Sequence, residues 1–342
     1  MLLEKVNNIN FSPVFDHVKN TFKRVKGSDA SALVIHKDSV VLEEYIGEQS
    51  NKPDSRIVQP DTQFHVASVR KSYIGFAVAY AVFNGYINSI DDLVLKYLPE
   101  LDESCWKGTT IRHLLTHTHG LSQTGETIYR EYPAGENWTY KQVGINALTT
   151  IVKRTTNRTI ADILHEQVFV PLGFSETNWY ANKHEKLVDV ILAYDEDKNW
   201  KISNSTEGDE PNMYVSTREL AMWGFLHLNE GKINGKQIIP KEIIHMATSI
   251  QSPAKIDKDL PQNGFLWFVK DLPAKKTEIG EKVSLGSFQI LGYTGVTLLV
   301  IPEKSLVAVR MFNSFGSPEG FDYLSDVRSF GDTVVGCLEK EI

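Results

Sequence analysis

The chain has 342 residues, of which 42% are hydrophobic and 23% are charged, and its formal net charge is −7. This length and composition are typical of a globular protein with two packed units or one large unit. The acidic balance argues against nucleic acid as a partner, because phosphate binding requires a positive surface. The sequence also lacks an apolar stretch long enough for a transmembrane segment.

The N-terminus and the cysteines bear on location. The first twenty residues alternate apolar with charged side chains and lack the apolar core of a signal peptide. Cys105 and Cys337 lie far apart in unrelated contexts, which favours two thiols in a reducing compartment over a disulfide. We therefore expect a cytoplasmic protein as encoded, or an extracytoplasmic one if a leader has been removed.

The hydrophobic periodicity changes along the chain. Residues 11–26 have apolar positions at helical spacing, with Ser12 as a candidate N-cap before Pro13. Residues 31–47 contain two β-rich runs around a His-Lys-Asp-Ser turn, which predicts a hairpin. Residues 66–260 are mostly helical in pattern. Strands are then expected at 264–270, 283–290, 295–301 and 305–312, followed by an amphipathic helix within 321–340.

Three Ser-x-x-Lys pairs occur, and about one is expected by chance when each residue type makes up roughly 6% of a chain. The pairs at 104–107 and 252–255 lie in polar or charged connections. Only the pair Ser68 and Lys71 opens a long run that is apolar around the whole helix, which is typical of a buried central helix. This context distinguishes it from the other two.

Ser68 and Lys71 share one helical face at this spacing. The first turn of a helix favours negative charge, so the N–H of Ser68 would stabilise a tetrahedral oxyanion. Apolar surroundings and the adjacent Arg70 disfavour the charged form of Lys71, and a neutral amine can accept the serine proton. Alternatively, Ser68 caps the helix and Lys71 extends to solvent.

A tyrosine and three histidines are further candidates. Tyr140 follows a Gly-x-x-Trp turn and precedes an amphipathic helix; its hydroxyl would transfer protons if a nearby cation lowered its pKa, or its ring would simply pack. His113, His117 and His119 contain part of a zinc signature, but the Asp and His required at 121 and 122 are Leu and Ser. We expect scaffold histidines and neither a metal nor a cofactor.

These motifs occur in the order found in the serine beta-lactamase and penicillin-binding protein superfamily. The chain most resembles its branch of class C beta-lactamases, D,D-peptidases and EstB-type esterases, over about residues 30–315. Further blocks resemble the family in sequence order, namely DTQFHVASVRKS, GYINSIDDLVLKYLPEL, IRHLLTHTHGL, VFVPLGFSET, VSTRELAMWG and VIPEKSLVAV. The third block accounts for the histidines as scaffold.

The resemblance implies a beta-lactamase/transpeptidase-like α/β (α+β) fold. An antiparallel sheet flanked by helices would be formed by residues 1–60 and 262–342, residues 61–261 would form a mainly helical domain, and the active site would lie between them. Ser68 would attack a carbonyl and form an acyl-enzyme. Lys71 and Tyr140 would transfer the proton, and water would release the acyl group.

The second motif departs from the family pattern. Where the family has Tyr-Ser-Asn or Tyr-Ala-Asn, this chain has Tyr140-Lys141-Gln142. Gln142 keeps the carboxamide that would bind a substrate amide, but it is one methylene longer. Lys141 would bring a second cation near the site. Two glycines of the family are replaced by Met213 and Tyr214, so Tyr214 is expected to narrow the cleft and contact substrate.

The third motif, Lys/His-Thr-Gly in the family, falls on Ile290-Leu291-Gly292 when the later Pro-Glu block is kept in phase. Two aliphatic side chains then replace the polar pair that would bind a substrate carboxylate. A shifted register would place Tyr293-Thr294-Gly295 in the motif instead. The oxyanion hole would be completed with Ser68 by the N–H of Tyr293, or of Val296 in the shifted register.

We therefore expect a serine hydrolase that acts on a small ester or amide, with weak beta-lactam acylation. The alternatives are a penicillin-binding protein or D,D-peptidase, a beta-lactamase proper, or a degenerate homologue that binds a peptide-like or small ligand. Gln142 and Ile290 are the residues that favour the degenerate alternative.

Overall fold

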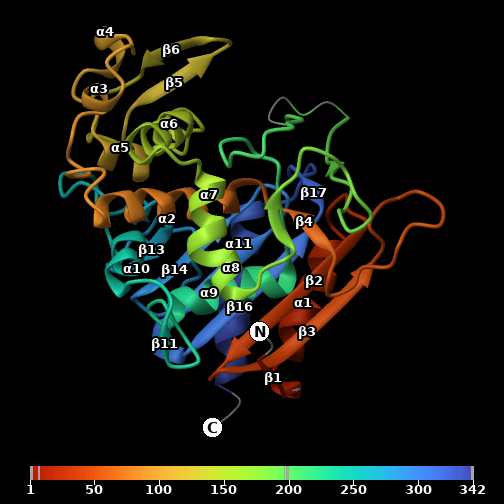
Figure 1. The fold of residues 1–342 in the computed structure, drawn as a ribbon. Coiled ribbons are helices and arrows are strands. Elements are labelled where there is room, and N and C mark those ends of the chain that lie inside the picture. Colours follow the sequence, from red (N-terminus) through yellow and green to blue (C-terminus); the bar gives the residue numbers. More distant parts are fainter. Residues whose placement is uncertain (1–2, 7, 196, 198–199, 340–342) are drawn as a thin grey trace.

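The fold is organised around a large sheet whose strands come from the two ends of the chain (Figure 1). The computed structural model describes residues 3–6, 8–195, 197 and 200–339. The sheet has eight strands in the order β1-β3-β2-β16-β15-β14-β13-β12. Their bounds are β1 (Glu4–Lys5), β2 (Asp29–His36), β3 (Ser39–Gly47), β12 (Gln262–Asn263), β13 (Phe268–Lys270), β14 (Ser287–Leu291), β15 (Thr297–Ile301) and β16 (Leu306–Phe312). The expected assembly of one sheet from both termini is confirmed.

Neighbouring strands are antiparallel, as predicted, except at one edge, where β1 runs parallel to β3 and makes the sheet mixed. The predicted β2–β3 hairpin is present. Its turn residues Lys37 and Asp38 have φ angles of 48° and 63°. Two consecutive residues with positive φ are typical of a type I′ turn, whose twist matches that of the paired strands.

Helices cover both faces of this sheet (Figure 1). On one face, α1 (Ser12–Phe22) and α11 (Tyr323–Leu338) pack against each other, and α1 contacts β2. On the other face, α9 (Thr217–Leu228) contacts β2, β15 and β16. Because successive side chains of a strand point to opposite faces, β2 contributes to both hydrophobic layers and is buried over its whole length.

Most of the remaining elements lie between the two sheet segments and form helices and small sheets, and β17 follows the last strand of the large sheet. The remaining helices are α2 (Arg70–Phe83), α3 (Val94–Tyr97), α4 (Glu103–Trp106), α5 (Ile111–Leu115), α6 (Ile145–Thr156), α7 (Ile160–Leu164), α8 (Val170–Leu172) and α10 (Lys241–Thr248). The remaining strands are β4 (Gln63–His65), β5 (Leu121–Thr124), β6 (Thr127–Arg130), β7 (Thr177–Trp179), β8 (Ile191–Leu192), β9 (Met213–Ser216), β10 (Lys232–Ile233), β11 (Lys236–Gln237) and β17 (Ser314–Phe315).

Helix α2 lies at the centre of this region and contacts α6, α7 and α10. It is apolar around most of its circumference, and it is accordingly buried, as the sequence predicted. Gly75 allows the helix to approach the chain at Phe265, because a Cβ at Gly75 would lie 2.1 Å from the Phe265 carbonyl oxygen. The helix that begins just after Ser68 is therefore held rigidly in the core.

Several predicted boundaries differ from the observed ones; the strand expected at 283–290, for example, begins only at Ser287. Ser12 is not the N-cap of α1: Phe11 occupies that position without a side-chain cap, because a 3-10 turn capped by Asn8 already leads into the helix. The strand expected at 264–270 begins only at Phe268. Before it, Leu266 adopts a φ of 66°, which is incompatible with an extended strand.

Three other expectations concern the chain as a whole. Cys105 and Cys337 are both buried, and the reducing compartment inferred from their positions stays a prediction. Among the residues that the structure describes, none of the helices has the length and apolar character needed to cross a membrane. The division into residues 1–60 with 262–342 and residues 61–261 stays a prediction; α9, from the second segment, packs on the large sheet.

Candidate active site

Ser68, Lys71 and Tyr140 lie together at the start of α2. Ser68 is in the 3-10 turn Ala67–Val69 between β4 and α2, and it is partly exposed to solvent. Lys71 is 1% exposed. Its Nζ lies 3.1 Å from Ser68 Oγ and 2.7 Å from Tyr140 Oη. The structure thus brings together the three side chains to which the sequence assigned the chemistry.

The turn that carries Ser68 is held by residues on either side of it. Ala67 has a φ of 45°, an uncommon conformation for a residue with a Cβ. The Ala67 N–H donates to His65 Nδ1 at 3.3 Å, and Thr294 Oγ1 donates to the His65 carbonyl at 2.7 Å. A strained backbone that is fixed by its surroundings is common at reactive residues.

The environment of Lys71 favours its neutral form. Burial lowers the pKa of Lys71 well below its ordinary value, and the adjacent Arg70 charge lowers it further. Arg70 is itself 2% exposed and donates from Nη1 to the Asp209 carbonyl at 3.3 Å. These are the two causes expected from the sequence, and they make Lys71 a suitable acceptor for the Ser68 proton.

Tyr140 behaves differently from the expectation. Burial of its hydroxyl raises the pKa of Tyr140 to about 12, and this outweighs the opposite effects of the Ser68 hydrogen bond and the Arg70 charge. The condition that a nearby cation should lower this pKa is therefore not met. Tyr140 remains a neutral phenol near neutral pH, able to relay a proton while it stays hydrogen-bonded to Lys71.

The ring of Tyr140 is fixed by its neighbours. It packs against His117 and Phe268, with ring centroids 4.5 and 6.1 Å away. The loop that leads to it is anchored because the Thr139 N–H donates to the His117 carbonyl at 3.0 Å and Trp138 Nε1 donates to Asn263 Oδ1 at 2.7 Å. His117 therefore supports the site through packing and its backbone.

The other two histidines support local backbone. His113 Nδ1 accepts from the Thr110 N–H at 3.1 Å and completes a capping box, and His119 Nδ1 accepts from the Leu121 N–H at 2.9 Å. Among the described residues, no group of three His, Cys, Asp or Glu side chains is arranged to hold a metal ion.

The two departures in the second motif have different consequences. Lys141 points to the β5–β6 hairpin, where its Nζ lies 3.1 Å from Glu131 Oε1 and 3.0 Å from Ser122 Oγ. The expectation that Lys141 adds a cation to the site is therefore wrong, because its charge is paired on the hairpin. Gln142 is exposed in the turn that leads into α6.

The third motif lies beside the nucleophile in the ungapped register. A Cβ at Gly292 would lie 2.3 Å from the Val66 carbonyl oxygen and 3.4 Å from Ala67 Cβ, so only glycine allows this approach. Residues 293–295 instead form the turn into β15, since the Gly295 N–H donates to the Gly292 carbonyl at 2.9 Å. This contact supports Ile290-Leu291-Gly292 as the segment that corresponds to the motif.

The side chains of this segment are apolar. Ile290 is 0% exposed within the core, and Leu291 is partly buried. Thr294, whose hydroxyl the shifted register would offer to substrate, is buried and bonded to His65. Tyr293 is 36% exposed, and its N–H belongs to the peptide that directly follows Gly292, the residue in close contact with Val66.

Replacing Gly292 with alanine is expected to lower activity at least tenfold and to destabilise the fold by about 1–3 kcal/mol, because the new methyl group displaces the strand from the Ser68 turn. Ester hydrolysis and urea unfolding measure the two effects. Gly336→Ala is the matched control: a Cβ at Gly336 in α11 meets nothing within 4 Å, so this variant should keep full activity. Equal behaviour of the two variants would contradict the proposed contact.

Large side chains pack around His65, three residues before Ser68. Tyr214 is partly exposed in β9, opposite His65, with ring centroids 5.2 Å apart, whereas Met213 is buried. Of the two bulky replacements, only Tyr214 is therefore available to a substrate. Sequence analysis missed Trp200, whose ring lies 5.0 Å from that of His65. No local signal distinguishes Trp200, because its partners come from distant segments.

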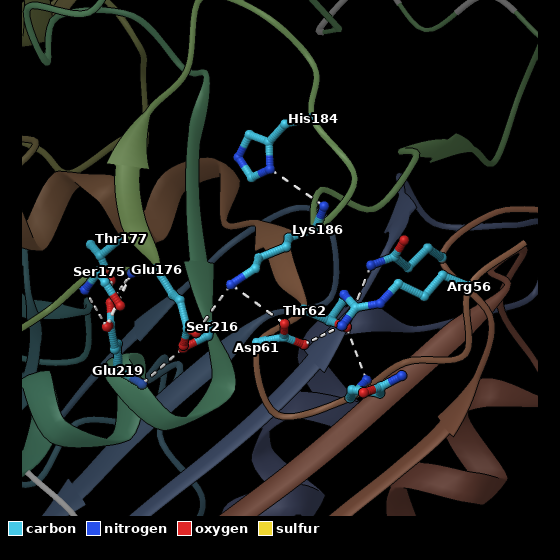
Figure 2. Close-up of polar contacts among 12 residues, drawn as sticks. Arg56, Asp61, Thr62, Ser175, Glu176, Thr177, His184, Lys186, Ser216 and Glu219 are labelled. Atoms are coloured by element: carbon cyan, nitrogen blue, oxygen red, sulfur yellow. Dashed lines mark hydrogen bonds and ion pairs between the residues drawn. The ribbon is translucent and has the colours of Figure 1, made fainter.

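A polar network supports the strands that carry His65 and Tyr214 (Figure 2). The buried Glu219 carboxylate accepts from the Ser175 N–H at 2.7 Å and from Thr177 Oγ1 at 2.6 Å, which joins α9 to the start of β7. Lys186 Nζ lies 3.4 Å from Asp61 Oδ2 just before β4. Together with the pairing of β9 to β4 and β7, these contacts hold the strand that leads to Ser68.

Comparison with known proteins agrees with this geometry. The beta-lactamase family model matches residues 18–330, which is most of the chain. The chain belongs to the beta-lactamase family. Members of this family are serine hydrolases, and the resemblance to beta-lactamases, penicillin-binding proteins and EstB-type esterases is confirmed.

Individual relatives of this beta-lactamase family chain span different lengths of it. An uncharacterized protein of Alkalihalophilus pseudofirmus is 56% identical over 99% of both chains. Esterase EstB of Burkholderia gladioli is 26% identical over 40% of this chain and 43% of its own. A penicillin-binding protein homologue from Caulobacter crescentus has the same fold, with a TM-score of 0.77 at 18% identity over 98% of this chain and 100% of its own.

Proposed function

We propose that this protein hydrolyses small, uncharged esters or amides through an acyl-enzyme on Ser68. The observation that carries the proposal is the continuous contact from Ser68 Oγ through Lys71 Nζ to Tyr140 Oη, at 3.1 and 2.7 Å. A nucleophile, a base with a lowered pKa and a second proton carrier are the groups that acyl transfer requires.

The reaction follows from these positions. Neutral Lys71 takes the hydroxyl proton as Ser68 Oγ bonds to the substrate carbonyl carbon, and the carbonyl oxygen becomes an oxyanion stabilised by the N–H groups of Ser68 and Tyr293. The proton passes from Lys71, directly or through Tyr140, to the leaving oxygen or nitrogen as its bond to carbon breaks. Water then attacks the acyl group by the same route, and Ser68 is restored.

The apolar third motif supports an uncharged substrate. Ile290, which is buried in the core, and Leu291 replace the polar pair that would bind a carboxylate. This segment therefore offers a substrate carboxylate no polar side chain, and leaving a buried carboxylate unpaired costs several kcal/mol. Tyr214 and Trp200 add aromatic surface suited to an apolar acyl group. Beta-lactams and D-Ala-D-Ala peptides carry a carboxylate, so we expect weak acylation by penicillins and efficient reaction with simple esters.

The proposal is tested with p-nitrophenyl butyrate and a fluorescent penicillin, each incubated with the wild type and with Ser68→Ala. Ser68-dependent ester turnover is the expected result. Labelling by the penicillin without turnover would support a penicillin-binding role instead. If the wild type and Ser68→Ala behave alike in both assays, the proposed hydrolysis through Ser68 fails and the degenerate, ligand-binding alternative is favoured.

A further inference from the structure

The proposed oxyanion donor at Tyr293 shares its peptide unit with the carbonyl of Gly292. A peptide is planar, so whatever holds the carbonyl also sets the direction of the N–H. Tyr323 Oη donates a hydrogen bond to the Gly292 oxygen at 2.9 Å. We propose that Tyr323 is a positioning residue, which orients the Gly292–Tyr293 peptide so that its N–H is the second donor of the oxyanion hole. This inference rests on the proposed function.

The Gly292 carbonyl oxygen accepts two hydrogen bonds. It accepts from the Gly295 N–H within the turn, at 2.9 Å, as well as from Tyr323. Donors to a carbonyl polarise the peptide and make its N–H a stronger donor. The N–H of Tyr293 is therefore fixed before the reaction starts, and it needs no reorganisation when the oxyanion forms.

The position of Tyr323 is itself fixed by contacts of α11. It is the first residue of α11, and the preceding Asp322 caps the helix by accepting from the Ser325 N–H at 2.9 Å. One turn later, Asp326 forms a buried ion pair with Arg310 of β16. This ion pair anchors the first turn of α11 to the large sheet and so places the Tyr323 hydroxyl at the end of β14.

Arg310 of the same ion pair also contacts β15, the strand next to the Gly292–Tyr293 peptide. Arg310 Nε donates to Thr297 Oγ1 at 3.2 Å, and Thr297 pairs with Leu291 across β14 and β15. The rings of Tyr323 and Tyr293 are edge-on, with centroids 6.2 Å apart. Burial raises the pKa of Tyr323 above its ordinary value, so its hydroxyl remains a proton donor throughout the neutral range.

The test compares Tyr323→Phe with Tyr73→Phe. Each variant removes one phenolic oxygen, but the buried Tyr73 hydroxyl has no hydrogen-bond partner among the described residues. The readouts are kcat and KM for p-nitrophenyl butyrate and the inhibition constant of butylboronic acid, whose tetrahedral adduct with Ser68 places an oxygen in the oxyanion hole. Melting temperatures show that both variants fold.

Removing an oxyanion donor outright typically costs 10²–10³ in kcat, so losing only its alignment is expected to cost about tenfold. Tyr323→Phe should lower kcat by this factor with little change in KM, and it should weaken the boronate by a similar factor. Tyr73→Phe should change neither quantity. A general structural defect would not lower kcat and boronate affinity by the same factor.

The outcomes separate this inference from the function on which it rests. The inference would be overturned if Tyr323→Phe had the same kcat and boronate affinity as the wild type. The proposed function would still stand in that case, provided that Ser68→Ala abolished turnover. Absence of Ser68-dependent turnover in the wild type would overturn both. If Tyr323→Phe does not fold, difluorotyrosine at position 323 supplies a stronger donor; tighter boronate binding is then expected, and unchanged binding would overturn the inference.

Discussion

Replacing Lys71 with methionine is expected to lower kcat/KM for p-nitrophenyl butyrate by about 10²–10⁴, the range associated with loss of a general base. Methionine fills a similar volume and suits a buried position, so the loss reports the amine rather than the packing. Lys71 is 1% exposed and contacts both Ser68 and Tyr140, and without it the serine proton has no acceptor.

Lys141→Met is the matched control for this variant. Lys141 is the nearest lysine in sequence to Tyr140, but its Nζ is paired with Glu131 on the β5–β6 hairpin. Its removal should change kcat/KM by no more than about twofold, because an exposed ion pair contributes little. A similar loss in both variants, or full activity in Lys71→Met, would show that Lys71 is not the base.

The pH profile of the wild type follows from the same two groups. Lys71 must be neutral to accept a proton, so activity rises as the pH increases through its pKa, which burial places well below the ordinary value of 10.5. Tyr140 must keep its proton, and its pKa of about 12 places the decline at strongly alkaline pH. Activity that falls between neutral pH and pH 10 would contradict these assignments.

Replacing Asp326 with alanine is expected to destabilise the protein by about 3–5 kcal/mol, because it leaves the charge of Arg310 buried without its partner. Arg310 is 1% exposed and Asp326 is 6% exposed, and Thr21 Oγ1 also donates to the Asp326 carboxylate at 2.8 Å. The change in the free energy of unfolding is measured by urea denaturation.

Glu100→Ala serves as the comparison for Asp326→Ala. Glu100 forms an ion pair with Arg154 at 2.7 Å, but both side chains are about half exposed. Such pairs are screened by solvent, so no measurable change in stability is expected. Equal stability of Asp326→Ala and Glu100→Ala would mean that the ion pair on α11 does not anchor this helix.

Local sequence patterns were sufficient for the central part of the site. A spacing of three residues at the start of a helix places Ser68 and Lys71 on one face wherever that helix lies in the fold. The surrounding apolar run also predicted the burial and the neighbouring charge that lower the pKa of Lys71. The β2–β3 hairpin was predictable for the same reason, because its turn is contained in a few consecutive residues.

Other features depend on segments that are distant in sequence. The direction of Lys141 is set by Glu131 on the hairpin, and the burial of the Tyr140 hydroxyl, which raises its pKa, is set by packing. The sequence alone left two registers open for the third motif, one at residues 290–292 and one at residues 293–295. The close approach of Gly292 to Val66 supports one of them, and this approach exists only once β14 lies beside the Ser68 turn.

The sequence by itself determined the family, the sheet built from both termini, and the serine, lysine and tyrosine proposed to carry the reaction. These follow from residue types at short spacings and from the order of motifs along the chain. Only the tertiary structure decided what surrounds them, including the packing of Trp200 on His65 and the hydrogen bond from Tyr323 to Gly292. Such contacts join segments far apart in sequence, and their geometry arises from packing that no local pattern records.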